Sequence, residues 1–193
     1  MKKFIVIFAW FVLAVSANAI AQQGKGNSLV IIDPELPLID ILHKQIHPDS
    51  RIVYLEKSNN PLGAILKILK AHAPVSALHI MSHGKPGQLI FSGTEVTTSM
   101  LDQNEHVLGM WKDHFSQHGD VLLYGCEVGK GREGVEFIQS LAVLIGLDIA
   151  ASDNHTGTFR KGGDWFLEVK SGRIETKLVV SQKIIEQYVA VLQ

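Results

Sequence analysis

The chain has 193 residues, of which 46% are hydrophobic and 19% are charged. This length suits a single globular domain, and the apolar content excludes an intrinsically disordered chain. The formal net charge of −1 provides no basic field, so we expect no nucleic acid as a partner. A single cysteine excludes an intramolecular disulfide and a cysteine-rich zinc site.

The first residues have the pattern of a secretory signal peptide. Met1–Lys3 is basic, Phe4–Val15 is almost wholly apolar, and Ser16–Ala21 offers small residues at cleavage spacing. We therefore expect residues 1–21 to be removed and residues 22–27 to form a mobile lead-in. The expected location is secreted, periplasmic or cell-surface, with no membrane association after cleavage. An uncleaved anchor is the alternative, but the apolar run is shorter than the roughly 20 residues of a spanning helix.

From Ser28 onward, short apolar runs alternate with segments of helical periodicity. The apolar runs predict buried strands at Ser28–Asp33, Arg51–Leu55, Val75–Ser82, Val121–Tyr124 and Leu147–Ser152. The periodic segments predict helices at Leu36–His47, Pro61–Leu69, Ser99–Gln117, Arg132–Ile145 and Gln182–Leu192. Lys85–Val96 reads as an inserted hairpin, and Trp165–Ile174 as a terminal strand or hairpin.

This alternation predicts an α/β fold with a mostly parallel central sheet and helices on both faces, a three-layer sandwich. We expect one domain over residues 28–176 and a helix within residues 177–193 that packs on or beside it.

A histidine and the cysteine each stand just beyond a core strand. His83 and Gly84 follow the strand at Val75–Ser82, and Cys126 follows the next core strand after a single glycine, Gly125. Open α/β sheets bind ligands at the carboxyl ends of their parallel strands. The sequence therefore predicts that His83 and Cys126 share one crevice.

The segments HIMSHG and LLYGCEVGKGREG resemble the caspase-like (clan CD) cysteine peptidases, where His-Gly follows the third strand and Cys the fourth. The closer resemblance is to the bacterial domain-of-unknown-function family 4347, found at the amino end of large secreted repeat proteins. The motifs SHG-x-x-G, YGC-x-x-x-x-G, AASD and GGDWxLE carry it over Leu29–Ile174. Glu127 departs from that family, which usually has an uncharged residue after the cysteine.

The resemblance to the caspase-like group implies a cysteine endopeptidase or a self-processing protease acting on a peptide or protein. Cys126 would be the nucleophile and His83 the general base. The backbone N–H groups of Gly84 and Cys126 would form the oxyanion hole, and no cofactor or metal is expected. Thiolates form beside cations and helix starts, and Lys130 and Arg132 stand close to Cys126 in sequence.

Ser152 and Asp153 end the fifth expected strand, where the caspase-like group builds its specificity pocket. The resemblance therefore implies that both residues bind substrate. An acidic Asp153 or Asp164 there would favour a basic side chain before the scissile bond. The alternative is that Asp153 simply forms a turn.

Other readings remain open. A non-catalytic module with the same fold would use this crevice, or the hairpin Lys85–Val96, to bind a partner or a surface polymer. A redox-sensing thiol is disfavoured because no resolving cysteine exists. His114 and His118 are four residues apart, but no motif supplies a third metal ligand, so we expect no metal site. His79 is expected to be a hydrogen-bonded core residue.

Overall fold

The computed structural model describes residues 27–193, except for the side chain of Ile185. The signal peptide expected at residues 1–21, and all but the last residue of the lead-in, lie outside this range. A six-stranded sheet forms the centre, in the order β11-β8-β7-β3-β1-β2. Its strands are β1 (Ser28–Ile32), β2 (Arg51–Tyr54), β3 (Val75–Met81), β7 (Phe115–Tyr124), β8 (Asp148–Ala151) and β11 (Val169–Lys170). Neighbouring strands are parallel except for β11, which is antiparallel to β8.

Helices and two small sheets surround this centre. The helices are α1 (Ile39–Gln45), α2 (Pro61–His72), α3 (Thr98–Gln103), α4 (Glu105–Gly109), α5 (Gly131–Ile145) and α6 (Ile184–Gln187). The small strands are β4 (His83–Lys85), β5 (Gln88–Phe91), β6 (Thr94–Thr97), β9 (His155–Thr156) and β10 (Gly163–Asp164). The expected α/β class with a largely parallel sheet between helices is therefore confirmed, as is the hairpin, which forms most of the sheet β4-β5-β6.

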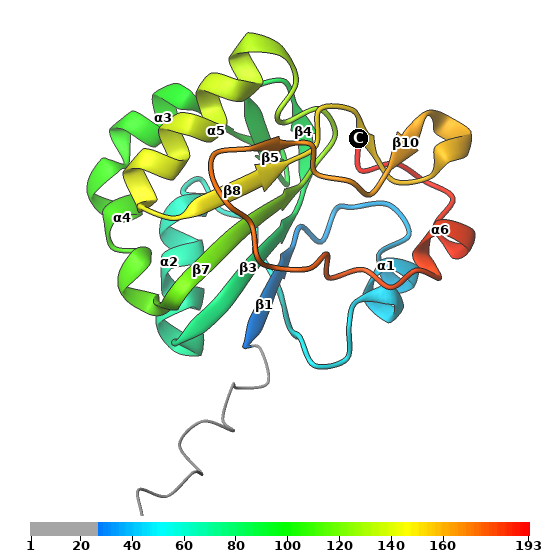
Figure 1. The fold of residues 1–193 in the computed structure, drawn as a ribbon, viewed down its shortest axis with the longest axis horizontal. Coiled ribbons are helices and arrows are strands. Elements are labelled where there is room, and N and C mark those ends of the chain that lie inside the picture. The colour runs from blue at the N-terminus through cyan, green and yellow to red at the C-terminus, as the bar shows by residue number, and fades with distance from the viewer. Residues whose placement is uncertain (1–26) are drawn as a thin grey trace, which may run out of the picture.

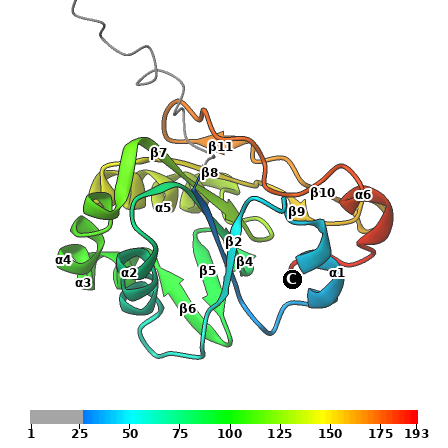
Figure 2. The same ribbon diagram turned by 90° about the horizontal axis from the view of Figure 1, so that it is seen from below.

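The two faces of the central sheet are covered differently. Helices α2 to α5 pack against one face, whereas α1, α6 and the last part of the chain cover the other (Figures 1 and 2). Right-handed crossovers explain this asymmetry. The chain moves from β1 to β2 in one direction and then from β2 through β3 and β7 to β8 in the other, which puts every later crossover helix on one face. The second face is left to one crossover helix and the C-terminal segment.

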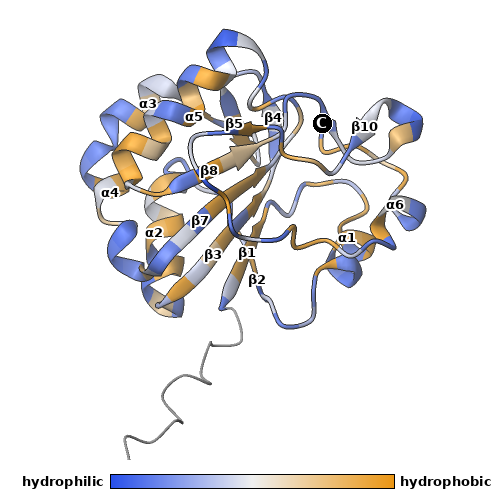
Figure 3. Ribbon diagram, viewed as in Figure 1, coloured by the Kyte–Doolittle hydropathy of each residue, from blue (hydrophilic) through white to orange (hydrophobic). Residues whose placement is uncertain are grey.

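Burial of apolar side chains holds both faces together. Figure 3 shows apolar residues along the central strands and in stripes on the helices that cover them. Leu66 and Leu69 of α2, and Phe137 and Leu141 of α5, lie in the core of the first face. Each fully buried aliphatic or aromatic side chain contributes about 1.5–3 kcal/mol. Among residues 27–193, no helix has the length and apolar character to cross a membrane.

The helix expected at Ser99–Gln117 is wrong in its second half. The structure has the short helices α3 and α4 there, and β7 already begins at Phe115. Asn104 ends α3 and begins α4, and its side chain donates to the Met100 carbonyl at 2.9 Å, which interrupts a continuous helix. Trp111 still lies in the core. The apolar residues whose spacing suggested one long helix are therefore buried by two shorter helices and the segment that follows them.

The helix expected at Gln182–Leu192 is likewise much shorter. Only α6 is helical, and its C-terminal cap, Tyr188, already has an extended backbone. Tyr188, Ala190 and Leu192 are buried while Val189 is 52% exposed, the alternation of an extended segment. Residues 188–192 therefore run along the molecule as a strip, which ends close to β4 in both ribbon views (Figures 1 and 2).

Candidate functional site

His83 and Cys126 lie just beyond two strands that pair directly. The last residues of β3 and β7, Met81 and Tyr124, are register partners in the parallel sheet. A Cβ built on Gly84 would lie 2.8 Å from the Cys126 carbonyl oxygen and 2.6 Å from the Val128 side chain. The two backbones therefore touch, and they approach this closely because position 84 has no side chain.

The Cys126 thiol is covered. Its residue is 1% exposed, and Sγ lies 3.9 Å from the carbonyl oxygen of Thr156. Burial raises the pKa of the thiol, and the Glu127 carboxylate raises it further, whereas contacts with the backbones of Thr156 and Leu192 act in the opposite direction. Cys126 is therefore a protonated thiol at neutral pH in this conformation.

The positive charges expected beside Cys126 are paired with carboxylates. Lys130 forms an ion pair with Glu127, and the Arg132 guanidinium lies 2.6 Å from Glu136 on the exposed side of α5. The expectation that these cations stabilise a thiolate is not met in this structure.

Two histidines in segments that flank Cys126 each have an unsatisfied ring nitrogen. Within residues 27–193, the Nδ1 atoms of His83 and His155 are both buried and lack a hydrogen-bond partner. An unpaired buried polar group costs about 1–3 kcal/mol. Such groups occur at functional sites, where a substrate or a moving proton completes them. His83 stands before the Cys126 turn, and His155 belongs to the segment that covers it.

The turn that carries Cys126 is fastened to the segment after β8. The N–H groups of Glu127 and Gly129 donate to the carbonyls of Asn154 and Ser152, at 2.7 and 2.8 Å. The Thr156 hydroxyl donates to the Gly125 carbonyl at 3.3 Å. Glu127 itself has a positive φ of 61°, a conformation that non-glycine residues seldom adopt. These bonds fix the backbone around Cys126.

Ser152 and Asp153 lie beside this turn with different surroundings. The Ser152 side chain is buried and donates to the Asn154 carbonyl at 3.1 Å, so it stabilises the turn. Asp153 is exposed, and its backbone N–H donates to Glu168 at 3.1 Å. Asp164 accepts from Phe166 N–H at 2.8 Å and from the Asn154 amide at 3.0 Å. Of the acidic candidates for substrate binding, Asp153 is the one whose carboxylate faces solvent.

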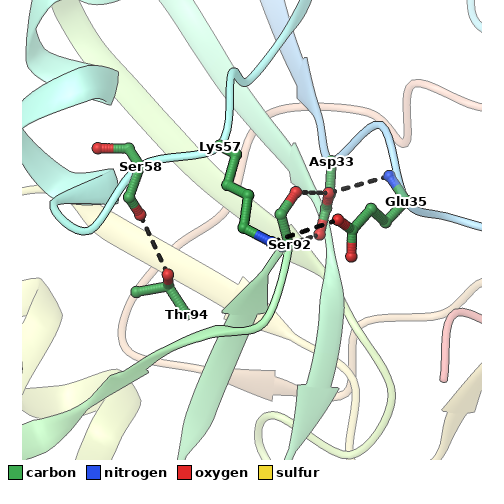
Figure 4. Close-up of polar contacts among 6 residues, drawn as sticks. All are labelled: Asp33, Glu35, Lys57, Ser58, Ser92 and Thr94. Carbon is green, nitrogen blue, oxygen red and sulfur yellow. Dashed lines mark hydrogen bonds and ion pairs between the residues drawn. The ribbon is translucent and has the colours of Figure 1, made fainter.

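A buried carboxylate braces the small sheet that begins with His83. Asp33 directly follows β1 and accepts from both the N–H and the hydroxyl of Ser92, at 2.8 Å each, in the turn between β5 and β6 (Figure 4). Ser92 has a positive φ of 47°. A weaker ion pair between Lys57 and Glu35, at 3.9 Å, lies at the surface of the same region. Asp33 thus holds the tip of the hairpin against the central sheet.

We predict that Ser92→Ala lowers the free energy of unfolding by about 1.5 kcal/mol, because a buried charge-assisted hydrogen bond is lost. Ser92→Gly loses the same bond but relieves the positive φ, so it should cost about 1 kcal/mol less than Ser92→Ala. Urea denaturation of both variants measures the difference. Equal stabilities of the two variants would contradict the assigned backbone strain.

Sequence reasoning did not find the residues that cover the thiol. Thr156 lies between the expected strand at Leu147–Ser152 and the expected strand or hairpin at Trp165–Ile174, and Tyr188 and Leu192 lie in an expected helix. The one signal in the sequence is that residues Tyr188–Leu192 form a continuous apolar run, which also fits a strand. Among residues 27–193, no cluster of three or more His, Cys, Asp or Glu side chains is arranged to hold a metal ion.

Together these features define a mixed α/β domain whose histidine and cysteine stand beyond neighbouring strands at the carboxyl edge of a largely parallel sheet. The family model described as Domain of unknown function (DUF4347) matches residues 29–192, so the chain belongs to that family. The comparison with curated proteins gave no match.

Among solved structures, the chain is similar to one described as "Crystal structure of a small-chain dehydrogenase". The TM-score is 0.37 at 8% identity, covering 63% of this chain and 78% of the other. A likeness at this level carries no inference about activity.

Proposed function

We propose that this protein is a caspase-like cysteine peptidase, with Cys126 as nucleophile and His83 as general base, acting on a peptide or on its own chain. The observation that carries the proposal is the direct contact between the two strand-end segments, in which Gly84 approaches the Cys126 carbonyl. The unpaired Nδ1 of His83 supports it, because a base needs a free nitrogen.

The reaction needs a short sequence of proton transfers. The Cys126 thiol gives its proton to the His83 imidazole, and the sulfur forms a bond to the scissile carbonyl carbon. The N–H groups of Gly84 and Cys126 would stabilise the developing oxyanion, a contribution of about 2.7–4 kcal/mol for each donor. The imidazolium returns the proton to the leaving amine, and water then hydrolyses the thioester and restores the thiol.

The covered thiol means that the described conformation is a resting state of the proposed enzyme. Cys126 is only 1% exposed and accepts no substrate in this conformation, so its uncovering must precede the chemistry. The signal-peptide pattern of residues 1–21 supports a secreted, periplasmic or surface location for this activity.

Digestion of a peptide library tests the proposal. We predict cleavage by the intact chain and a loss of about 10³-fold or more in rate for Cys126→Ala and for His83→Ala, because each removes a reacting group. His155→Ala, which alters the other histidine with an unpaired nitrogen, should cleave at the rate of the parent chain. Cleavage that survives Cys126→Ala would exclude the assigned nucleophile.

A second candidate function is a non-catalytic binding module, which the burial of Cys126 favours. Such a module would use the crevice or the hairpin β5–β6 to hold a partner or a surface polymer. The same library separates the two functions, because a binding module retains peptides or polymers without cutting them, and Cys126→Ala would leave that retention unchanged.

A further inference from the structure

The segment Ala190–Leu192 pairs through one isolated β-bridge with the polypeptide beside Cys126, and is called the added strand below. Val191 pairs antiparallel with Gly157. Thr158 N–H donates to the Ala190 carbonyl, and Leu192 N–H donates to the Thr156 carbonyl, both at 2.9 Å. This is the hydrogen-bonding pattern by which an extended peptide joins the edge of a sheet.

The added strand and the thiol share one acceptor. The Thr156 carbonyl oxygen, which accepts from Leu192 N–H, is also the oxygen that Cys126 Sγ approaches at 3.9 Å. Leu192 is fully buried in the same apolar cluster as Cys126. Leu192 and the Cys126 sulfur therefore lie against the same carbonyl group, that of Thr156.

The lack of a side chain at Gly157 allows the backbone of Ala190 and Val191 to approach closely. A Cβ at this position would lie 2.4 Å from the Ala190 carbonyl oxygen and 2.7 Å from the Val191 Cα. Its φ of +139° also disfavours any residue other than glycine. A peptide backbone can therefore lie closer to position 157 than any side chain there would allow.

The segment is anchored before the added strand. The Tyr188 hydroxyl donates to the Pro37 carbonyl at 2.9 Å, and its ring meets Trp165 edge-on at 5.5 Å. Val189 follows and is 52% exposed. Residues 190–193 can therefore leave the edge by rotation near Val189 while Tyr188 stays in place.

We infer that the edge Thr156–Thr158 is a binding site for extended peptides with a small residue and, two positions later, an aliphatic residue, and that Ala190–Leu192 occupy it and cover Cys126. Ala190 and Leu192 are buried on the inner side of the strip, at 8% and 0% exposure, and this alternation defines the pattern. The inference rests on the proposed function for what happens to a peptide after it binds. A tethered segment competes at an effective concentration on the order of millimolar, so free peptides bind weakly until the segment leaves.

Alkylation of Cys126 by iodoacetamide reports the covering directly, because the chain has one cysteine. We expect Leu192→Ala, and a chain that ends at Val189, to react at least about tenfold faster than the parent chain, because the covering opens more often. Val143→Ala changes a valine of α5 that is 82% exposed and lies outside this segment, and it should react at the parent rate. If the shortened chain fails to fold, Leu192→Ala decides the question. Equal rates in Leu192→Ala and the parent chain would overturn the inference.

An acetylated peptide of residues 190–193 tests the ligand class. Added to the Leu192→Ala chain, it should restore slow alkylation, whereas a peptide in which the alanine and leucine exchange places should not. Equal protection by both peptides would overturn the assigned pattern. Protection without peptide hydrolysis would leave this site standing and overturn the proposed peptidase, whereas hydrolysis without protection would do the reverse.

Discussion

Gly134→Ala should lower the free energy of unfolding by about 3 kcal/mol or more, even though alanine is the better helix former. Gly134 lies in the first turns of α5, and a Cβ there would lie 2.2 Å from the Gly129 carbonyl carbon and 2.7 Å from the Val128 oxygen. These are backbone atoms of the turn that carries Cys126, so they cannot rotate away as a side chain does. The gain in helix propensity, about 1 kcal/mol, is smaller than the cost of moving that turn.

Gly109→Ala is the matched control for this substitution. Gly109 is the last residue of α4, and no atom lies within 4 Å of the Cβ it lacks. We expect no loss of stability, and a gain of about 0.4–1 kcal/mol from the less flexible unfolded chain. Urea denaturation of both variants measures the contrast. A Gly134→Ala chain as stable as the parent would contradict the close packing of α5 on the Cys126 turn.

His79 should make the protein lose stability in acid. Burial lowers the pKa of this histidine to about 3, and its Nδ1 lies 3.2 Å from the Tyr124 hydroxyl, which also accepts from Val179 N–H at 3.1 Å. Because the pKa in the unfolded chain is about 6.5, the folded state favours neutral imidazole. The contribution of neutral His79 to the free energy of unfolding is therefore fully present above pH 6.5 and is lost as the pH falls toward 3. At pH 4.5 the loss is about 2.5 kcal/mol.

Urea denaturation at pH 7.5 and pH 4.5, for the parent and for His79→Gln, isolates this contribution. His47 and Asp49 line the same cavity as His79 and are present in both proteins. We expect the stability of His79→Gln to fall less between the two pH values, by about 2.5 kcal/mol. An equal fall in both proteins would show that His79 is not the buried neutral group described here.

The central strands could be predicted because their burial is nearly complete. In β1, Leu29, Val30, Ile31 and Ile32 are all fully buried, so the chain reads as one continuous apolar run. The C-terminal segment could not be assigned in the same way. Its apolar residues fit both a helix and a strand, and packing against the apolar second face of the sheet, which sequence does not reveal, selects the extended form. Tyr188 and Leu192 are buried on that face.

The candidate site, like the fold, could be predicted from the sequence in some parts and not in others. The placement of His83 and Cys126 beyond neighbouring strands was predictable, because position after a core strand follows from sequence and parallel strands bring their carboxyl ends to one edge. The covering of Cys126 was not predictable, because Thr156 and Leu192 reach it from segments remote in sequence. The brace between Asp33 and Ser92 was missed for the same reason, since a lone aspartate before a proline reads as a turn residue.

The most direct test of the account is the rate at which Cys126 reacts with iodoacetamide at pH 7 when His83 is removed. Reaction occurs from the uncovered thiol, where an adjacent imidazole raises the thiolate fraction. We predict that His83→Ala slows alkylation about tenfold or more, equivalent to one unit in the pKa of the thiol, while His155→Ala leaves it unchanged. Equal rates in the parent and His83→Ala chains would contradict a functional pair of histidine and cysteine at this edge of the sheet.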